Sequence, residues 1–278
     1  MFTVFGSSGF IGSRVVQNLR DKEIGYINPS RNFRPEKWVG SLGHVIYCIG
    51  LTADFRTKPL ETMEAHVGYL VDVLRECAFD SFTYLSSTRV YGTVPYLLRE
   101  SLAQEDGVLA VNPNNFEDVY NISKLAGESA CLSSGRDNVK VVRLSNVYGY
   151  DAKSENFIFT LIRDALRDKR IVLRSTLESG KDHVGVDDVA RILPEIAVRG
   201  KQKIYNVASG KNVSVGRIVA RLQDLTGCVI EVDEKAQEMY FPRIDIGRLT
   251  GEFEFKPKNI VDDLEKLVEE YKRHGKRE

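Results

Sequence analysis

The residues with the clearest chemical potential are a tyrosine and a lysine four positions apart, Tyr120 and Lys124, in the segment YNISK. A helical pattern continues through Ala130, so this spacing places the phenol and the ammonium on one face of a helix. A free phenol has a pKa near 10, about three units too high for a base at neutral pH. A neighbouring positive charge favours the phenolate and so lowers this pKa. The pair predicts an acid/base tyrosine. The alternative is an ordinary surface pair, because YxxxK is common by chance.

Polar side chains follow two apolar runs that have the character of strands. Ser87 and Thr88 end the run FTYLSST, and Asn146 comes shortly after the run VVRL. Ligands of open α/β sheets bind at the carboxyl ends of strands, where such groups can hydrogen-bond a substrate oxygen. Serines after a strand are also common turn formers. It is their joint occurrence with Tyr120 that predicts a single site.

A glycine-rich turn, GSSGFIG at 6–12, lies between the strand-like run FTVF and a helical pattern that continues through Leu19. Glycines at a strand-to-helix turn allow a tight backbone and the close approach of a pyrophosphate to the helix N terminus. Glycines often simply make turns. This position in the chain nevertheless favours a dinucleotide site over a purely structural turn.

The end of the second predicted strand bears on which dinucleotide binds. The region reads YINPSRNFR, without the acidic residue that normally holds the adenosine ribose. No carboxylate there repels a 2′-phosphate, and Arg31 or Arg34 could pair with one. The sequence therefore predicts NAD or NADP and slightly favours NADP. The alternative is that these arginines are solvated loop residues.

Strand-length apolar runs alternate with helical patterns up to about residue 150, and these elements must position the residues above. Strands are predicted at 2–5, 24–27, 44–49, 82–85 and 139–144, and an amphipathic helix at 60–77. The alternation predicts an α/β fold with a Rossmann-type doubly wound parallel sheet.

Beyond residue 150 the pattern changes to a smaller α/β region. Helices are predicted at 157–168, 215–226 and 260–271, and short strands at 171–174, 204–207 and 229–232. Ser214 is a candidate N-cap and Gly227 a candidate helix stop. We expect residues 1–150 to form a cofactor domain, with a later contribution from about 183–210, and residues 151–278 to form most of a substrate-binding domain.

The composition narrows the classes of partner. The 278 residues include 39 basic and 39 acidic side chains, whereas nucleic acids and anionic membranes need a basic surface. The four cysteines form no CxxC pair, so we expect no metal site and reduced thiols. With no signal peptide and no long apolar stretch recognisable, we expect a soluble cytoplasmic protein without a nucleic-acid or membrane partner.

Taken together, the motifs resemble the extended short-chain dehydrogenase/reductases of the NAD-dependent epimerase/dehydratase family, typified by UDP-galactose 4-epimerase. The matching segments, in the family's order, are GSSGFIG (6–12), LSSTRVYG (85–92), YNISK (120–124), RLSNVYG (143–149), DHVGVDDVA (182–190) and YNVASG (205–210). They span nearly the whole chain. The resemblance implies a Rossmann domain and a smaller C-terminal domain that binds a nucleoside-diphosphate sugar.

The resemblance also implies roles for individual residues. Tyr120 would be the acid/base, Lys124 would lower the pKa of its phenol and hold the nicotinamide ribose, and Ser87 takes the position of the family's catalytic serine or threonine. With Arg31 included, the predicted cofactor-binding residues are Gly6, Gly9, Phe10, Ile11, Gly12, Arg31, Gly50, Leu51, Ser86, Tyr120, Lys124, Asn146 and Val147. The predicted substrate-binding residues are Ser87, Thr88, Asn146, Lys181 and Arg243. A homodimer through the helices around 60–77 and 120–132 is also implied, although packing on the sheet explains their apolar faces equally well.

Several positions depart from the family pattern. Dehydratases carry an acidic pair after the catalytic hydroxyl residue; here the pair is Thr88 and Arg89, which argues against 4,6-dehydration. The Cys/His pair of 3,5-epimerase/reductases does not fall at the motifs above. Lys181 stands where an arginine is expected and His66 where an asparagine is usual. No third strand is predicted between residues 32 and 43.

The leading functional prediction is a nucleotide-sugar epimerase or 4-keto reductase. A hydride would move between a sugar carbon and the nicotinamide while Tyr120 exchanges the hydroxyl proton and Ser87 orients the oxygen. Two alternatives stay open. One is the reduction of a non-nucleotide carbonyl compound. The other is a non-catalytic NAD(P)-binding regulatory protein, against which the complete set of Ser87, Tyr120 and Lys124 counts.

Overall fold

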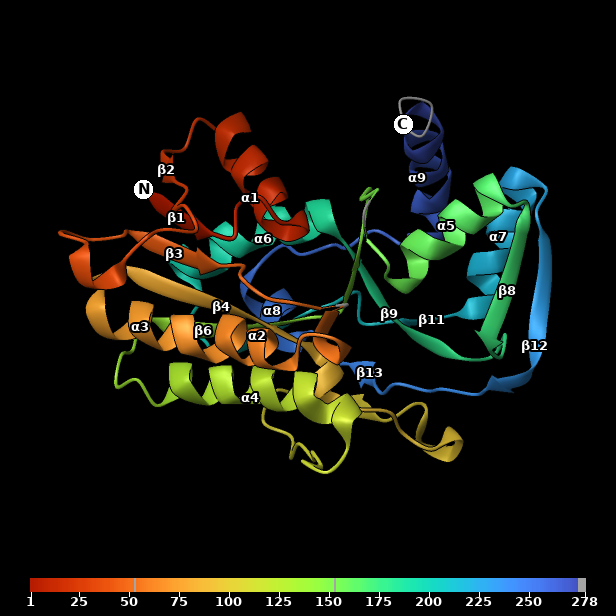
Figure 1. The fold of residues 1–278 in the computed structure, drawn as a ribbon, viewed down its shortest axis with the longest axis horizontal. Helices are drawn as coiled ribbons and strands as arrows, with labels where there is room; N and C mark the ends of the chain where they lie inside the picture. Colours follow the sequence, from red (N-terminus) through yellow and green to blue (C-terminus); the bar gives the residue numbers. More distant parts are fainter. Residues whose placement is uncertain (53, 153, 275–278) are drawn as a thin grey trace.

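The centre of the molecule is a six-stranded, fully parallel sheet in the order β10-β6-β4-β3-β1-β2 (Figure 1). This computed structural model describes residues 1–52, 54–152 and 154–274. The strands are β1 (Phe2–Phe5), β2 (Tyr26–Ile27), β3 (His44–Tyr47), β4 (Ser81–Ser87), β6 (Val139–Leu144) and β10 (Ile204–Val207). The strand order reverses between β1 and β3, the place where open α/β sheets bind ligands at their carboxyl ends. The predicted Rossmann-type doubly wound sheet is confirmed.

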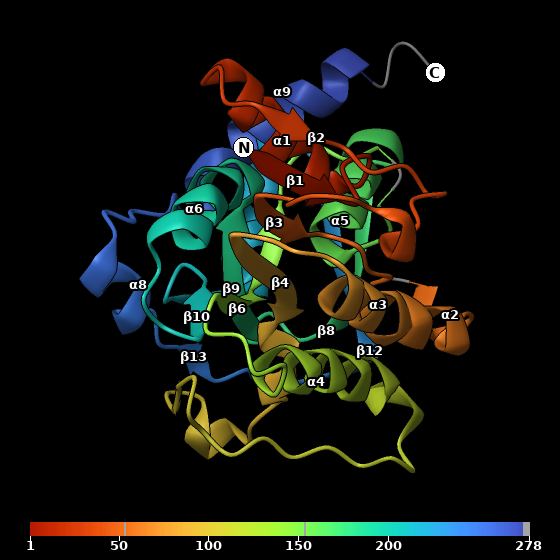
Figure 2. The same cartoon turned by 90° about the vertical axis from the view of Figure 1, so that its left-hand side faces the viewer.

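Helices cover both faces of the sheet (Figures 1 and 2). On one face α1 (Phe10–Asp21) packs beside α6 (Val186–Arg199). On the other face lie α2 (Pro59–Met63), α3 (Tyr69–Glu76) and α4 (Val119–Leu132). Every residue of β1 and β6 is buried, because these strands lie between two helical layers.

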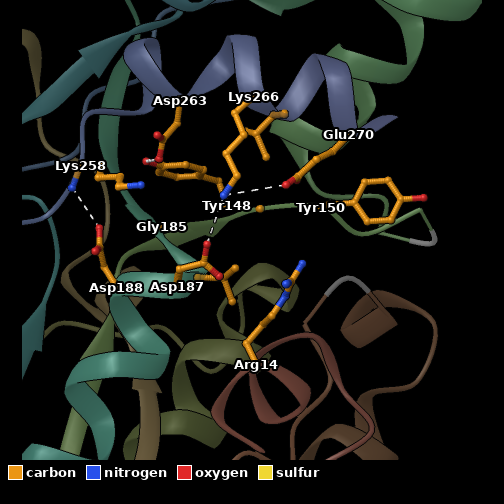
Figure 3. Close-up of a pocket in the computed structure, with 13 residues that line it drawn as sticks. Arg14, Tyr148, Tyr150, Gly185, Asp187, Asp188, Lys258, Asp263, Lys266 and Glu270 are labelled. Carbon is orange, nitrogen blue, oxygen red and sulfur yellow. Dashed lines mark hydrogen bonds and ion pairs between the residues drawn. The ribbon is translucent and has the colours of Figure 1, made fainter. Parts of the chain in front are cut away.

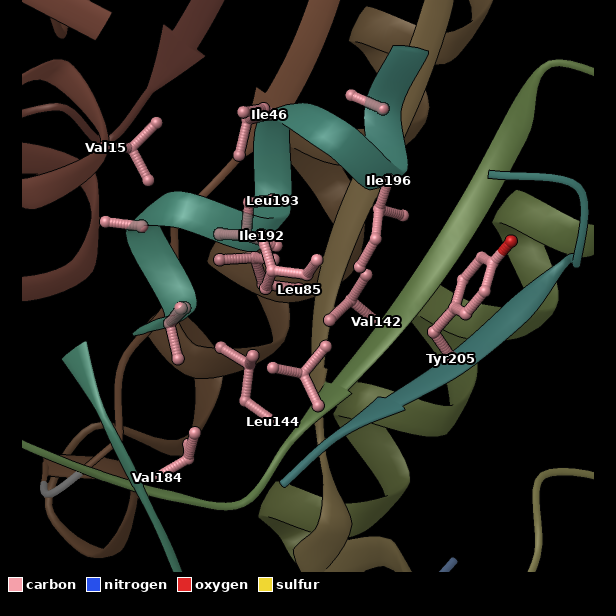
Figure 4. Close-up of a cluster of buried hydrophobic side chains, with 14 of the residues drawn as sticks. Val15, Ile46, Leu85, Val142, Leu144, Val184, Ile192, Leu193, Ile196 and Tyr205 are labelled. Atoms are coloured by element: carbon pink, nitrogen blue, oxygen red, sulfur yellow. The ribbon is translucent and has the colours of Figure 1, made fainter. Parts of the chain in front are cut away.

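One apolar core fills the space between the sheet and the layer of α1 and α6 (Figure 4). Ile46 of β3, Leu85 of β4 and Val142 of β6 meet Leu193 and Ile196 of α6, and none of the five is more than 6 % exposed. Full burial of an aliphatic side chain contributes about 1.5–3 kcal/mol. This core therefore fixes the order of the strands whose carboxyl ends carry the candidate site.

The chain beyond residue 150 builds most of a second, smaller α/β region, at the right in Figure 1. The core of this region joins α5 (Phe157–Arg167), α7 (Val215–Thr226) and α9 (Ile260–His274). The strands outside the six-stranded sheet are β5 (Leu102–Ala103), β7 (Asn146–Tyr148), β8 (Arg170–Ser175), β9 (Gly180–Gly185), β11 (Asn212–Ser214), β12 (Val229–Gln237) and β13 (Arg243–Ile244). The last of the α-helices to be named is α8 (Gly247–Glu252). The strands pair as β11-β9-β7, β12-β8 and β13-β5.

The ends of α7 show how local sequence sets an element. Ser214 Oγ accepts a hydrogen bond from the N–H of Arg217 at 3.4 Å, and Gly227 ends the helix with φ at 68°. Both features are the ones predicted, because a hydroxyl caps orphan N–H groups and glycine tolerates the left-handed conformation.

Two elements differ from the expected pattern. β2 pairs at only two residues, Tyr26 and Ile27, shortly before Pro29, which has no N–H to donate. Between β2 and β3, where no strand was predicted, the chain forms a 3-10 turn at Pro35–Lys37, and β2 is the edge of the sheet. The helix expected at 60–77 is interrupted by a π-helical turn at Glu64–Gly68. A π turn inserts one residue into the helix, which the apolar spacing of the sequence does not reveal.

Candidate active site

Tyr120 and Lys124 lie one turn apart on the buried face of α4, and each is 5 % exposed. Lys124 Nζ donates to the carbonyl oxygen of Leu85 at 2.9 Å and lies 6.0 Å from the centroid of the Tyr120 ring. Burial lowers the pKa of Lys124 to about 7, although the carboxylate of Glu128 opposes this change. The lysine is thus held against β4, and its ammonium can lose a proton near neutral pH.

The phenol of Tyr120 meets the hydroxyl of Ser87. Burial raises the pKa of Tyr120; a hydrogen bond with Ser87, the charge of Arg89 and a hydrogen bond with Thr52 all act to lower it. Ser87 ends β4, and its Oγ accepts the N–H of Arg89 at 3.1 Å. The structure therefore brings Ser87, Tyr120 and Lys124 together from two elements, a strand end and the helix above it.

Arg89 adds a positive charge beside the tyrosine. Its guanidinium carbon lies 5.3 Å from the centroid of the Tyr120 ring and 4.8 Å from that of Phe55. Its Nη2 pairs with Glu117 Oε2 at 3.3 Å. The sequence showed Arg89 only as a missing dehydratase carboxylate. Its contacts escaped notice because Phe55, Arg89 and Glu117 come from segments far apart in the chain.

His66 lies in the π-helical turn and is fully buried against α4. Its Nε2 accepts the N–H of Leu51 at 3.3 Å, and its Nδ1 lies 2.8 Å from Ser123 Oγ. The His66 ring meets the Tyr120 ring edge to face, with centroids 5.5 Å apart. Burial, with the charge of Lys124, lowers the pKa of His66 to about 2, so the ring is neutral and Nδ1 carries the proton. In the sequence, the only sign of this role was that a histidine stands at position 66, where the family usually has an asparagine.

The glycine turn after β1 fits the pyrophosphate of a dinucleotide. Gly6 has φ at 72°, and a Cβ on Gly12 would lie 2.2 Å from the carbonyl oxygen of Gly6, so only glycine permits this turn. α1 begins at Phe10, behind Gly9, which has no side chain to accept from the first N–H groups of the helix. Those donors and the positive end of the helix dipole are the features that bind phosphate.

Other predicted cofactor residues surround this turn. Gly50 lies beside Lys124, since a Cβ on Gly50 would be 3.3 Å from the Nζ of that lysine. Phe10 and Ile11 pack their side chains against apolar cores, so their backbone N–H groups are what they can offer a phosphate. Arg31 is exposed in the segment that follows β2.

A buried ion pair supports α4 one turn beyond Lys124. Arg143 of β6 contacts Glu128 through Nη2 and Oε2 at 2.7 Å, and each side chain is 4 % exposed. The hydroxyl of Ser86, a predicted cofactor residue, donates to the same carboxylate and so serves the helix. Sequence reasoning missed this pair. The sequence did offer a sign of this pair. Glu128 comes four residues after Lys124, which places its carboxylate on the same, buried face of the helix.

Asn146 and Val147 begin β7, which pairs with β9 in the second region. Asn146 is exposed, and its Nδ2 donates to the carbonyl oxygen of Asp182 at 2.8 Å. Val147 is half-buried and packs against the core of α1 and α6. These residues therefore join the strand ends of the first sheet to the second region.

The predicted substrate contacts are spread over both regions. Thr88 is buried, 8 % exposed, directly after Ser87. Lys181 of β9 is half-buried, with its Nζ 5.2 Å from the centroid of the Phe157 ring. Burial, with the charge of Arg89, lowers the pKa of Lys181 to about 8. Arg243 is exposed on β13, which packs beside β9.

A separate charged cavity lies between α1 and α9 (Figure 3). Arg14 of α1 and Glu270 of α9 line it, and Lys266 Nζ lies 3.4 Å from Asp187 Oδ2 at its edge. Its volume is about 40 Å³, enough for a few water molecules but not for a sugar. The site around Tyr120 is therefore the better candidate for substrate.

Within the described ranges, no group of three or more His, Cys, Asp or Glu side chains is placed to hold a metal ion. The four cysteines are free thiols. No helix of the described chain is both long enough and apolar enough to cross a membrane.

The fold of this chain is shared by many solved structures, among them the following two. RMD from Pseudomonas aeruginosa, complexed with NADPH, has a TM-score of 0.78 at 22 % identity, covering 98 % of this chain and 99 % of that one. UDP-glucose 4-epimerase from Thermotoga maritima, with UDP-glucose, has a TM-score of 0.78 at 19 % identity, covering 98 % of both chains.

Sequence comparison is more specific than the fold. A dTDP-glucose 4,6-dehydratase from Streptomyces griseus is 27 % identical over 215 residues, which cover 74 % of this chain. The match spans 62 % of the length of that relative. A family model described as NAD dependent epimerase/dehydratase matches residues 39–208, more than half of the chain, including Ser87, Tyr120 and Lys124. The chain therefore belongs to the NAD dependent epimerase/dehydratase family.

Proposed function

We propose that this protein is an NAD(P)-dependent nucleotide-sugar epimerase or 4-keto reductase. The observation that carries the proposal is the convergence of Ser87, Tyr120 and Lys124 at the carboxyl end of β4, beside the glycine turn. Hydride transfer at a carbon that bears a hydroxyl requires a group that exchanges the hydroxyl proton. A solved structure of the same fold is a UDP-glucose 4-epimerase with UDP-glucose, which supports this substrate class.

The residues of the chain handle the proton and hold the reactants. When bound, the nicotinamide supplies the hydride acceptor or donor. The Ser87 hydroxyl orients the reacting sugar oxygen, and the Tyr120 phenolate takes the hydroxyl proton on oxidation and returns it on reduction. Lys124 holds the nicotinamide ribose. A bound dinucleotide with its anionic pyrophosphate favours the protonated form of this lysine.

The same residues argue against 4,6-dehydration, although one relative is a dehydratase. Removal of water needs a general acid and a general base beside the sugar. Thr88 and Arg89 occupy the two positions after Ser87. The carboxylate of Glu117 next to them is already paired with both Arg56 and Arg89. We therefore propose that Tyr120 exchanges the hydroxyl proton in a simple hydride-transfer reaction, without removal of water.

We assign the dinucleotide to the glycine turn and the sugar nucleotide to Lys181 and Arg243. Lys181 is a half-buried cation, and a substrate diphosphate would restore a pKa that burial lowers to about 8. Either NAD or NADP is compatible with the turn. Arg31 is exposed in the segment that follows β2, and no carboxylate stands at the end of that strand, which slightly favours NADP.

We assign cofactor binding and substrate binding to different parts of the chain, according to how those parts pack. Residues 1–150 bind the cofactor together with about 183–210, because α6 completes the core on one face of the sheet and β10 is its edge strand. Residues 151–278 supply most of the substrate side, built on α5, α7 and α9.

We also propose a homodimer through the outer faces of the helices around 60–77 and 120–132. Val67, Val71, Ile122 and Leu125 are only half-buried in the single chain, which leaves apolar surface for a second copy to cover. Light scattering of the purified protein should give twice the chain mass of 31.4 kDa. Leu125→Glu should give a single-chain mass, and a wild-type monomer at all concentrations would exclude this interface.

The test of function begins with the cofactor and the substrate class. We expect NAD(H) or NADP(H) to bind, and a tightly retained dinucleotide would favour the epimerase over the reductase. UDP-, GDP-, dTDP- and CDP-sugars should be screened for a rise in melting temperature, because a ligand bound only by the folded state stabilises it. No rise with any of them, together with a rise for a simple ketone, would overturn the nucleotide-sugar proposal.

A further inference from the structure

Arg89 is held in place by two separate segments of the chain, one with Phe55 and Arg56 and one with Glu117. Its guanidinium carbon lies 4.8 Å from the ring centroid of Phe55, and that of Arg56 lies 4.5 Å from the same ring. Glu117 Oε2 joins the two guanidinium groups, at 2.5 Å from Arg56 Nη2 and 3.3 Å from Arg89 Nη2. Glu117 precedes α4 by two residues. This clamp therefore ties the start of the catalytic helix to the turn that follows β4.

The clamp presents one face of Arg89 to Tyr120, with the guanidinium carbon 5.3 Å from the ring centroid. Phe55 also packs on that ring, with centroids 5.7 Å apart. The backbone N–H of Arg89 donates to Ser87 Oγ. One residue thus contacts the Tyr120 ring through its side chain and the Ser87 hydroxyl through its backbone.

Other groups face Tyr120, but they differ in charge. His66 meets the ring edge on and is neutral, because burial lowers its pKa to about 2. Lys124 lies 6.0 Å from the ring centroid, donates to the Leu85 carbonyl, and is easily deprotonated, with a pKa of about 7. The uncharged hydroxyls are Ser87, Thr52 and Tyr84, the last of which interacts with Tyr120 electrostatically.

Arg89 is the cation among these groups that keeps its charge at every working pH, because a guanidinium does not deprotonate in proteins. With Arg56 it contributes two positive charges against the single carboxylate of Glu117, so the clamp is positive overall. A positive charge within about 4–6 Å of an acidic group, such as a phenol, favours its ionised, negative form over the neutral form.

We propose that Arg89 is a positioning residue that holds the Tyr120 ring and stabilises its phenolate, beside and independently of Lys124. The proposal rests on Tyr120 as the acid/base of the proposed function. It gives a role to the arginine at a position where dehydratases carry a carboxylate. It also explains why that arginine is braced by Glu117 and stacked on Phe55 when it could extend freely into solvent.

The test replaces Tyr120 with 3,5-difluorotyrosine by site-specific incorporation and follows its single ¹⁹F NMR signal against pH. The fluorinated phenol is more acidic than tyrosine, which brings its titration into the range where the protein is folded. Arg89→Gln should raise the titration midpoint by about one pH unit. Arg89→Lys keeps the charge but loses the planar stacking group. Its titration midpoint should therefore lie between those of the wild type and Arg89→Gln.

The matched control is Arg99→Gln. Arg99 is an exposed arginine whose guanidinium lies 4.8 Å from the ring of a different tyrosine, Tyr96, so its removal should leave the Tyr120 signal unchanged. If Arg89→Gln does not fold, Glu117→Gln provides a second test. Loss of the carboxylate leaves both arginines unneutralised and should lower the midpoint.

An unchanged midpoint in a folded Arg89→Gln protein would overturn the proposal, as would an unchanged or raised midpoint in Glu117→Gln. Because the titration needs neither substrate nor turnover, it is independent of the proposed function. If no nucleotide sugar supports hydride transfer while the midpoint moves, the proposed function fails and the electrostatic role of Arg89 stands.

Discussion

Arg143 Nη2 lies 2.7 Å from Glu128 Oε2, and each side chain is 4 % exposed. Arg143 Nε lies 3.0 Å from Glu128 Oε1, so the pair is bidentate. It joins β6 to the same helix that carries Tyr120 and Lys124, on the side where the ammonium meets the sheet. The position of α4 therefore depends on a charge pair that is buried away from solvent.

Glu128→Gln should destabilise the protein strongly, because the buried guanidinium of Arg143 loses its countercharge. We expect the free energy of unfolding to fall by about 3–5 kcal/mol, measured by urea denaturation. Glu231→Gln is the control, since it breaks an ion pair with Arg170 whose side chains are 45 % and 58 % exposed, and it should change stability far less than Glu128→Gln does. Equal losses in the two variants would show that burial of the Glu128 pair is unimportant.

Tyr120→Phe should abolish proton exchange while leaving the binding sites intact. We expect hydride transfer to slow by about 10²–10⁴-fold, measured in a single turnover with the substrate identified by thermal shift. The affinity for the dinucleotide, measured by NAD(P)H fluorescence, should change little. Tyr96→Phe, at an exposed position, is the control. Wild-type rates in Tyr120→Phe would remove the tyrosine from the chemistry.

Stability should depend on pH through Lys124. Its folded pKa, about 7, lies below the ordinary lysine value near 10.4, so the unfolded chain binds more protons between these values. Stability therefore rises with pH in this window, and from pH 7 to 9 the contribution is about 2 kcal/mol. In Lys124→Met this rise should be missing from urea unfolding curves at pH 7, 8 and 9.

The control for that measurement is Lys211→Met, for a lysine on the exposed surface, which should keep the rise. If Lys124→Met and wild type change in parallel across this range, the ammonium of Lys124 is not destabilised by burial. Since both variants are compared with wild type at each pH, other titrating groups cancel.

Gly12→Ala should disrupt the dinucleotide turn. The new Cβ would lie 2.2 Å from the carbonyl oxygen of Gly6, and this oxygen belongs to backbone that cannot easily move. We expect a lower melting temperature and loss of NAD(P)H binding in a fluorescence titration. Gly251→Ala in α8, where a Cβ meets nothing within 4 Å, should bind the dinucleotide normally and leave stability unchanged or higher. Normal binding by Gly12→Ala would place the cofactor elsewhere.

Elements with a strong local pattern could be predicted closely from the sequence. β1 and β6 match their predicted bounds, since segments rich in β-branched or aromatic residues are favoured in a buried parallel sheet. α7 matches as well because Ser214 and Gly227 mark its ends by hydrogen bonding and by backbone conformation. The π-helical turn at Glu64–Gly68 was not predicted, because one inserted residue leaves the apolar spacing nearly unchanged.

The sequence by itself determined the sheet class, the glycine turn and the Tyr120/Lys124 pair, because each depends on residues close together in the chain. Only the tertiary structure decided what surrounds that pair. The neutral His66 ring on Tyr120 and the Arg89 clamp join segments separated by tens of residues. Such contacts depend on how helices pack on the sheet and on which charges burial leaves unpaired, and neither is encoded in local spacing.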